Sequence, residues 1–110
     1  MKKIAFVLFT LVLLFGCGKP LPEDKSAYAG HWQSKEMSLL ILQDGTIAYE
    51  RLKNGGSTSV KGPIKEFVGD DFVVGFAFLT TTFDVTQPPV FSSGQWIMVV
   101  DGVTLVKSEH

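Results

Sequence analysis

Cysteine chemistry is confined to one position of this chain, because Cys17 is its only cysteine. A cysteine thiolate is a nucleophile and can be modified covalently. Cys17 comes just after an apolar run, residues 4–15, which itself follows the positively charged start Met1-Lys2-Lys3. The run is long enough for the core of a signal peptide but shorter than the roughly 20 apolar residues that span a bilayer. The sequence therefore predicts a secretory signal that ends beside a modifiable thiol.

The segment Leu14-Phe15-Gly16-Cys17 resembles the lipobox of bacterial lipoproteins. In that family a leucine stands three positions before the cysteine and a small residue stands directly before it; Leu14 and Gly16 match, while Phe15 is bulkier than the usual residue. The resemblance implies removal of residues 1–16, lipid on Cys17 and a membrane anchor. Gly18, where an aspartate would favour the inner membrane, points to the periplasmic face of the outer membrane. The alternative is an uncleaved apolar run that is itself the anchor.

The remaining polar residues form no catalytic or metal-binding set. Asp70 and Asp71 are adjacent, so in a strand their carboxylates point to opposite faces and cannot share a proton or a glycosidic bond. Asp84 stands apart from them, and His31 has no second ligand at metal spacing. We therefore predict no catalytic residue, no metal site, no cofactor and no enzyme activity.

Beyond the signal peptide the chain is long enough for one small domain. Residues 17–27 contain two prolines and several charges, which predicts a lipidated, extended tether, and residues 28–110 remain for the domain. From Cys17 onward eight basic residues stand against eleven acidic ones, scattered without a basic stripe. This charge pattern argues against nucleic acid as a partner and against electrostatic adhesion to anionic lipid.

Turn residues and alternating side chains predict an all-β domain. Asp44-Gly45, Asn54-Gly55-Gly56, Gly69-Asp70-Asp71 and Asp101-Gly102 separate apolar segments at intervals typical of antiparallel hairpins. Apolar residues alternate along the segments, as in the series Phe72, Val74, Phe76 and Phe78, in the pair Ile47 and Tyr49, and in the series Trp96, Met98 and Val100. Gly75 predicts a bulge or bend, and Pro88-Pro89 predicts an edge strand or loop. We expect an antiparallel meander of seven to eight strands, curled into a small barrel or a strongly bent sheet.

The segment Gly30-His31-Trp32 is similar to the Gly-x-Trp opening of lipocalin-type barrels. In that family the tryptophan closes one end of the barrel and stacks under a basic residue of the last strand. The resemblance implies that Trp32 is buried and lies against Lys107. It covers three residues, the expected arginine is a lysine, and this chain is shorter than a lipocalin.

The aromatic residues allow two interpretations. Phe72, Phe76 and Trp96, together with Trp32, either fill the core or line a cavity for one small apolar ligand. The first predicts a non-catalytic, membrane-anchored envelope lipoprotein, a structural or interaction module for an envelope protein or cell-wall material. The second predicts a carrier of a small apolar molecule in a lipocalin-like barrel. An exposed aromatic patch would favour the interaction module, and free volume inside the barrel would favour the carrier.

Overall fold

Tight turns with a left-handed backbone join several strands of the chain. In the computed structural model, which describes residues 20–76 and 79–108, both residues of Asn54-Gly55, Ser93-Gly94 and Asp101-Gly102 have φ angles between 50° and 82°. Two consecutive positive φ angles give a turn whose twist matches that of hairpin strands. At Asp44-Gly45 the Asp44 Oδ1 atom accepts a hydrogen bond of 3.0 Å from the Thr46 backbone N–H. The turns predicted at Asp44-Gly45, Asn54-Gly55 and Asp101-Gly102 are confirmed, and Ser93-Gly94 forms a further turn.

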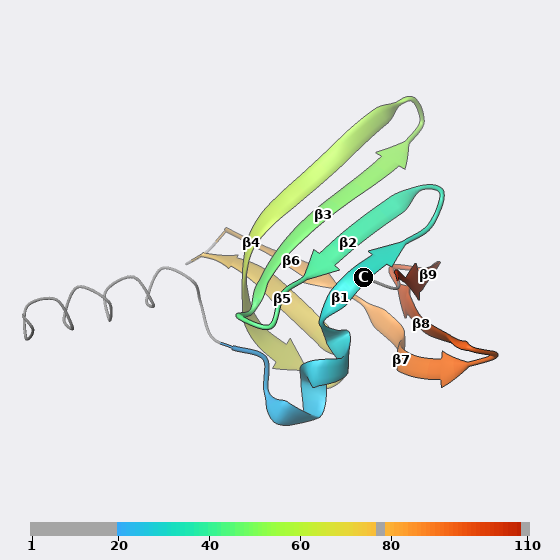
Figure 1. The fold of residues 1–110 in the computed structure, drawn as a ribbon. Coiled ribbons are helices and arrows are strands. Elements are labelled where there is room, and N and C mark those ends of the chain that lie inside the picture. Colours follow the sequence, from blue (N-terminus) through green and yellow to red (C-terminus); the bar gives the residue numbers. More distant parts are fainter. Residues whose placement is uncertain (1–19, 77–78, 109–110) are drawn as a thin grey trace, which may run out of the picture.

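The described residues form one 3-10 helix and nine strands of a single antiparallel sheet. In chain order these are η1 (Glu23–Tyr28), β1 (Gly30–Gln33), β2 (Met37–Ile41), β3 (Thr46–Lys53), β4 (Gly56–Val68), β5 (Asp71–Phe76), β6 (Leu79–Phe83), β7 (Val85–Ser92), β8 (Gln95–Val100) and β9 (Val103–Lys107). The order across the sheet is β6-β5-β4-β3-β2-β1-β9-β8-β7 (Figure 1). The all-β antiparallel prediction is confirmed, with nine strands in place of seven or eight. The segment Leu79–Phe83, which forms β6, has three consecutive threonines and therefore shows no alternation of apolar and polar residues.

The long strand β4 carries much of the curvature of the sheet. Its first part, up to Pro63, pairs with β3, and its last part, from Ile64, pairs with β5. The register shifts between Ile64 and Glu66, and an irregularity of this kind bends a strand and increases its twist. This irregularity lies in β4, whereas the sequence predicts a bulge or bend at Gly75 in β5. At Gly75, where φ is 138°, the reason for glycine is a close approach, since a Cβ atom would lie 2.1 Å from the Leu79 carbonyl oxygen.

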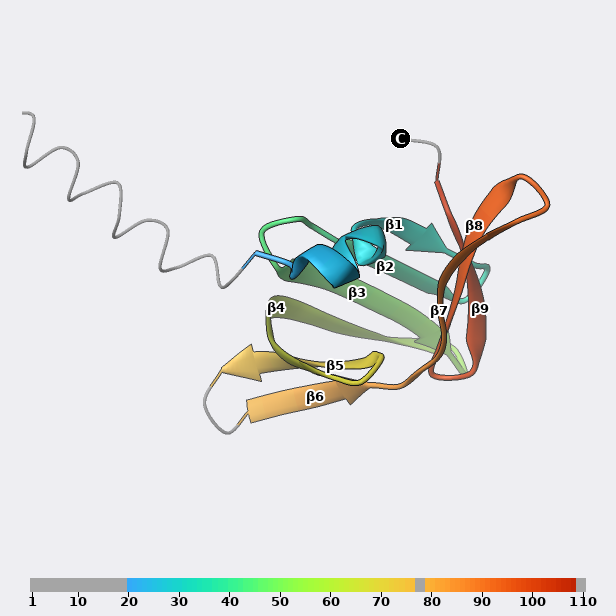
Figure 2. The ribbon, with the colours of Figure 1, turned by 90° about the horizontal axis from the view of Figure 1, so that it is seen from below.

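The two ends of the sheet meet where β6 passes into β7. Asp84 is the single residue between these strands, and its carbonyl accepts a hydrogen bond of 2.7 Å from the Asp101 N–H. The Val85 N–H donates to Asp71 Oδ1 at 2.7 Å, which ties β7 to the start of β5. The result is a curled half-barrel, in which β7 crosses from the end of β6 to the side of β8 and β9 (Figure 2). Pro88-Pro89 lies in β7, at an edge of the sheet as predicted.

Large side chains fill the concave side of the half-barrel. Phe72 and Phe83 are fully buried and stack with ring centres 5.0 Å apart. Tyr49 packs edge-on against Phe83 at 4.9 Å. The alternation predicted for β3, β5 and β8 is confirmed at these buried side chains: Ile47, Tyr49, Phe72, Val74, Met98 and Val100. The Phe76 backbone pairs with Leu79 at the end of β5, but its side chain and all of Phe78 lie outside the described residues.

The segment before β1 packs on the sheet. The Leu21 N–H donates to the Gln43 carbonyl at 3.0 Å, and η1 delivers the buried Tyr28, whose hydroxyl donates to the Asp70 carbonyl at 2.8 Å. Within the segment 17–27 that was expected to be an extended tether, the residues from Glu23 onward form η1, because burial of Tyr28 holds the end of this helix against the domain. The predicted signal peptide, residues 1–16, and the lipidation site Cys17 lie outside the described residues.

Candidate functional site

A lysine ammonium lies between two tryptophan rings on the inner face of β1, β8 and β9. The Lys107 Nζ atom is 5.0 Å from the centre of the Trp32 ring and 5.2 Å from that of Trp96. Trp32 and Lys107 are opposite residues in the register of β1 and β9. Nζ also donates a hydrogen bond of 3.2 Å to the Ala27 carbonyl. The contact between Trp32 and Lys107 that the Gly-x-Trp pattern implies is present.

Gly30 makes room for this lysine. A Cβ atom at Gly30 would lie 2.8 Å from Lys107 Cε, and its φ of 144° is rarely adopted by other residues. Trp32 itself is fully buried, and its indole N–H donates to the Tyr28 carbonyl at 2.9 Å. The first and third residues of the Gly30-His31-Trp32 segment therefore both serve to seat the Lys107 side chain.

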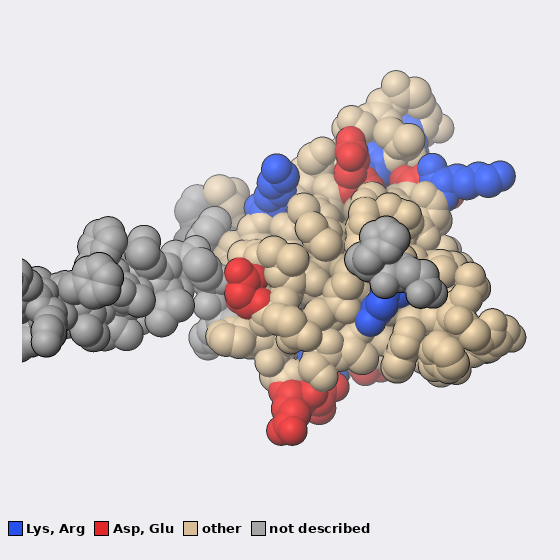
Figure 3. Space-filling view, in the orientation of Figure 1, with Lys and Arg blue, Asp and Glu red and all other residues tan. Residues whose placement is uncertain are grey.

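Trp96 stands at the rim of the sheet rather than in the core. It retains 37% of its exposure, and its ring meets that of Phe91, which is 59% exposed, at a centre distance of 5.6 Å in an edge-to-face arrangement. The β7–β8 hairpin that carries both rings extends beyond the half-barrel (Figures 1 and 2). Residues 85–100 contain no charged side chain, and the surface over this hairpin is correspondingly free of them in Figure 3. Phe91 is thus a surface residue.

An open groove, here called the Trp96 groove, runs between this hairpin and the β1–β2 connection. Its volume is about 650 Å³. The groove is lined by Gln33, Ser34, Lys35, Phe91, Gly94, Gln95, Trp96, Val106, Lys107 and Ser108. It therefore combines two exposed aromatic rings with amide and hydroxyl groups and two lysines.

The electrostatic character of the groove is positive. Among the described residues, Lys35 and Lys107 are in its lining and no aspartate or glutamate is, although acidic residues outnumber basic ones in the whole chain. Burial lowers the pKa of Lys107 from its ordinary value, because the charged form loses hydration. Lys107 takes part in neither the Lys25–Asp70 nor the Arg51–Glu36 ion pair.

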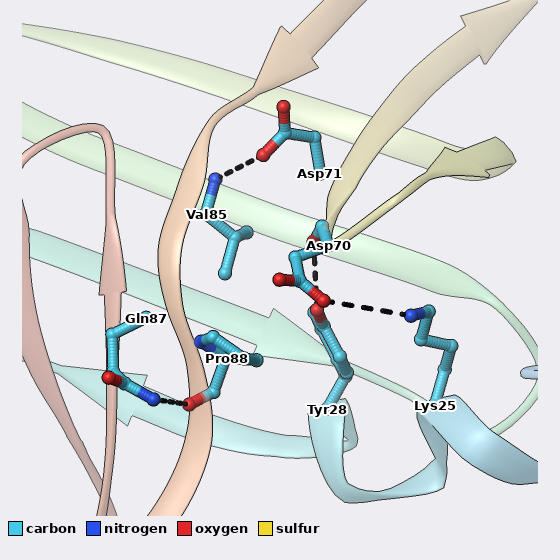
Figure 4. A network of polar contacts seen from close by, with 7 residues as sticks. All are labelled: Lys25, Tyr28, Asp70, Asp71, Val85, Gln87 and Pro88. Atoms are coloured by element: carbon cyan, nitrogen blue, oxygen red, sulfur yellow. Dashed lines mark hydrogen bonds and ion pairs between the residues drawn. The ribbon is translucent and has the colours of Figure 1, made fainter.

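The aspartates considered in the sequence, Asp70, Asp71 and Asp84, make contacts between elements of the fold. Figure 4 shows that Asp70 and Asp71 face different elements. Asp70 lies 3.9 Å from Lys25 Nζ in η1, whereas Asp71 accepts the hydrogen bond from Val85. Asp84 bonds through its backbone, its N–H donating to Asp101 Oδ1 at 2.9 Å. Within the described part of the chain, no three His, Cys, Asp or Glu side chains are grouped as metal ligands would be.

The candidate site residues from the sequence separate in the structure. Trp32 and Phe72 are core residues, Trp96 lines the groove, and Cys17 and the Phe76 side chain lie outside the described residues. Sequence reasoning missed the polar half of the groove, because Gln33 and Lys35 lie about 60 positions before Trp96 in the chain. The signal that could have drawn attention to the hairpin is the run without charge from residue 85 to residue 100.

Comparisons with known proteins returned no match among family models, curated proteins or solved structures. Among the described residues, the structure contains no helix with the length and apolar character needed to cross a membrane. The geometry of the groove and the lipobox-like segment therefore carry the functional argument.

Proposed function

We propose that this protein is a lipid-anchored envelope lipoprotein whose β domain binds a component of the cell envelope in the Trp96 groove, without catalysing a reaction. The observation that carries the proposal is the exposed Phe91–Trp96 ring pair on an uncharged hairpin. Clustered exposed aromatic rings are costly in water and are typical of binding surfaces. Here the two rings also hold each other in place, so little ordering is needed on binding.

Sheet extension is a poor explanation for this exposed hairpin. β7 is an edge strand, and an edge with free N–H groups can pair with another chain. Pro88 and Pro89 carry no N–H that could donate, and the pairing with β8 is irregular between Gln87 and Val90. The aromatic rings therefore offer a side-chain binding surface rather than a backbone one.

A lipid on Cys17 would hold the groove away from the bilayer. Three residues lead from Cys17 to Pro20, a reach of at most about 10 Å when fully extended. The start of the described chain, in blue, lies on the opposite side of the molecule from the tip of the β7–β8 hairpin in both ribbon views (Figures 1 and 2). The anchored domain would thus sit close to the membrane with its aromatic hairpin facing the periplasm.

A carrier of a small apolar molecule has less support. Such a function needs free volume among the inward-facing rings. Phe72 and Phe83 instead stack directly on each other, and Trp32 is covered by Lys107. The described interior is occupied by side chains at the positions where an apolar ligand was expected.

The proposal is tested by native mass spectrometry of the lipoprotein extracted gently from its own envelope. We expect an envelope component to remain bound to the wild-type protein. The bound fraction should be several-fold lower in Trp96→Ala and in Phe91→Ala. Leu79→Ala is the matched control, because Leu79 is 70% exposed but lies on β6, at the other edge of the sheet. Equal retention by Trp96→Ala, or a small apolar adduct in place of the envelope component, would overturn the proposal.

A further inference from the structure

We infer that the Trp96 groove recognises an anionic glycan, with a sugar ring against the Trp96 and Phe91 rings and a carboxylate directed to Lys107 and Lys35. The inference rests on the proposed function, because it names the chemical class of the component that the groove binds. It is carried by the composition of the lining, by the environment of the Lys107 ammonium and by the position of the hairpin.

The two aromatic rings and their polar neighbours match the two sides of a sugar. A pyranose has an apolar face of C–H groups, which packs on an aromatic ring, and a rim of hydroxyl and acetamido groups. Phe91 and Trp96 present rings at the edge of the groove. Gln33 and Gln95 add amide groups that both donate and accept hydrogen bonds, which suits hydroxyl and acetamido partners. The Gln33 amide nitrogen already lies 3.1 Å from the His31 Nε2 atom, and a purely apolar ligand would offer no hydrogen bond to either amide.

The Lys107 ammonium supplies the preference for negative charge. It has three N–H donors, of which one reaches the Ala27 carbonyl. Its position between the Trp32 and Trp96 rings fixes the direction of the charge and removes part of its hydration. A carboxylate in the groove would stabilise the charged Lys107 ammonium in place of the water that it has lost. Lys35, which also lines the groove, adds a second positive charge.

Two other classes of partner are less well matched. A lipid surface would have to reach the hairpin from the side opposite the anchor (Figures 1 and 2). An extended peptide would bind most simply by adding a strand to β7, where Pro88 and Pro89 lack the N–H groups that such pairing uses. A folded protein with acidic side chains can still occupy the groove, and the experiment below distinguishes it from a glycan.

The test is isothermal titration calorimetry with the full lipidated protein in detergent micelles. The probes are a hyaluronan hexasaccharide, which alternates N-acetylglucosamine with glucuronic acid, the neutral chitohexaose, and an oligo-glutamate of equal charge. We expect hyaluronan to bind most tightly, chitohexaose several-fold more weakly and oligo-glutamate not measurably. Trp96→Ala should weaken hyaluronan binding about tenfold or more, and Lys35→Gln about threefold with a reduced dependence on salt.

Lys53→Gln is the matched control for Lys35→Gln, because Lys53 is also exposed but lies at the end of β3, outside the groove lining. Binding of oligo-glutamate as tight as that of hyaluronan would show a response to charge alone and overturn the inference. So would the absence of binding to both glycans, or hyaluronan binding that Trp96→Ala leaves unchanged. If the glycans fail while an envelope protein is retained by the wild type and lost in Trp96→Ala, the glycan is excluded and the proposed binding function stands.

Discussion

Lys107 Nζ lies 5.0 Å from the centre of the Trp32 ring, and the two residues are directly opposite each other in β9 and β1. This pair joins the first and the last of the described strands beside the Trp96 groove. Trp32 faces the core and is fully buried, whereas Lys107 is half-buried and reaches the groove lining. In this contact Trp32 contributes to the stability of the sheet, and Lys107 contributes a positive charge to the groove.

Trp32→Ala should cost about 3–5 kcal/mol in the free energy of unfolding, because it removes a fully buried ring and leaves a cavity. Urea denaturation followed by circular dichroism measures this. Trp96→Ala is the comparison, and its loss should be clearly smaller, since Trp96 is 37% exposed and lies at the rim. A Trp32→Ala melting temperature lowered by a degree or two would contradict the burial.

Gly30→Ala should destabilise the fold through its clash with Lys107. The added Cβ would come within 2.8 Å of Lys107 Cε, at a φ of 144°. Part of the loss in unfolding free energy comes from the contact with the Lys107 side chain. This part should disappear in the double variant Gly30→Ala, Lys107→Ala, which lacks that side chain. A double-mutant cycle on unfolding free energies would show this coupling, of about 0.5–3 kcal/mol for residues in contact. Strictly additive losses would mean that the backbone conformation alone requires glycine.

Tyr28 should make the stability fall at high pH. Burial, followed by the carboxylates of Asp70, Asp71 and Asp24, raises the pKa of Tyr28 to about 12 from an ordinary value near 10. The folded state holds the phenolic proton more tightly than the unfolded state, so this contribution is complete below pH 10 and is lost between about pH 10 and 12.

The variant Tyr28→Phe separates this effect from other titrations. It loses the hydrogen bond to the Asp70 carbonyl and should be about 1 kcal/mol less stable at pH 7. Because phenylalanine does not titrate, the stability gap between wild type and variant should narrow above pH 10 in urea denaturation. The lowered pKa of Lys107 acts in the opposite direction but is shared by both proteins and cancels. A gap that is constant from pH 7 to 11 would contradict the raised pKa.

Local sequence signals predicted the strands and turns well, because their causes are local. Asn54-Gly55 and Asp101-Gly102 adopt positive φ angles that most other residues avoid, and Phe72 and Val74 alternate because a strand has a period of two. The contact between Trp32 and Lys107 is implied by the resemblance of Gly30-His31-Trp32 to the Gly-x-Trp opening of lipocalins, whereas the pairing of β1 with β9 is not predicted.

The features that sequence reasoning missed depend on contacts between distant residues. Residues 23–28 form a helix that ends at the buried Tyr28. The Tyr28 hydroxyl donates a hydrogen bond to the carbonyl of Asp70, which lies 42 positions later in the chain. Trp96 follows the inward alternation of Met98 and Val100 but stands beyond the covered part of the sheet, so its exposure depends on how far the hairpin extends. Gln33 and Lys35 become its neighbours through the curvature of the sheet, which no local pattern records.

Cys17→Ser should abolish the anchor, since a hydroxyl does not replace the thiolate as the lipid acceptor. We expect an unlipidated precursor that retains residues 1–16, and a mass that lacks the lipid when the intact protein is measured. Membrane fractionation is the second measurement, with Ser57→Ala as a control because Ser57 is an exposed residue of β4 outside the groove lining. If the Cys17→Ser variant stays in the membrane fraction and its mass differs from that of the wild type only by the substitution, the apolar run, residues 4–15, is itself the anchor.

Asp71→Ala should loosen the junction between the two ends of the sheet. Asp71 Oδ1 accepts the hydrogen bond from the buried Val85 N–H at 2.7 Å, so its removal leaves a buried donor without a partner at a cost of about 1–3 kcal/mol. Hydrogen exchange should become faster at the Val85 amide than at core amides such as that of Met98, because β7 can then part from β5. Asp44→Ala is the control, as Asp44 accepts its hydrogen bonds from Thr46 in an exposed turn and should leave the Val85 amide protected. Equal acceleration at Val85 and Met98 in Asp71→Ala would mean that the half-barrel opens as a whole, rather than at this junction.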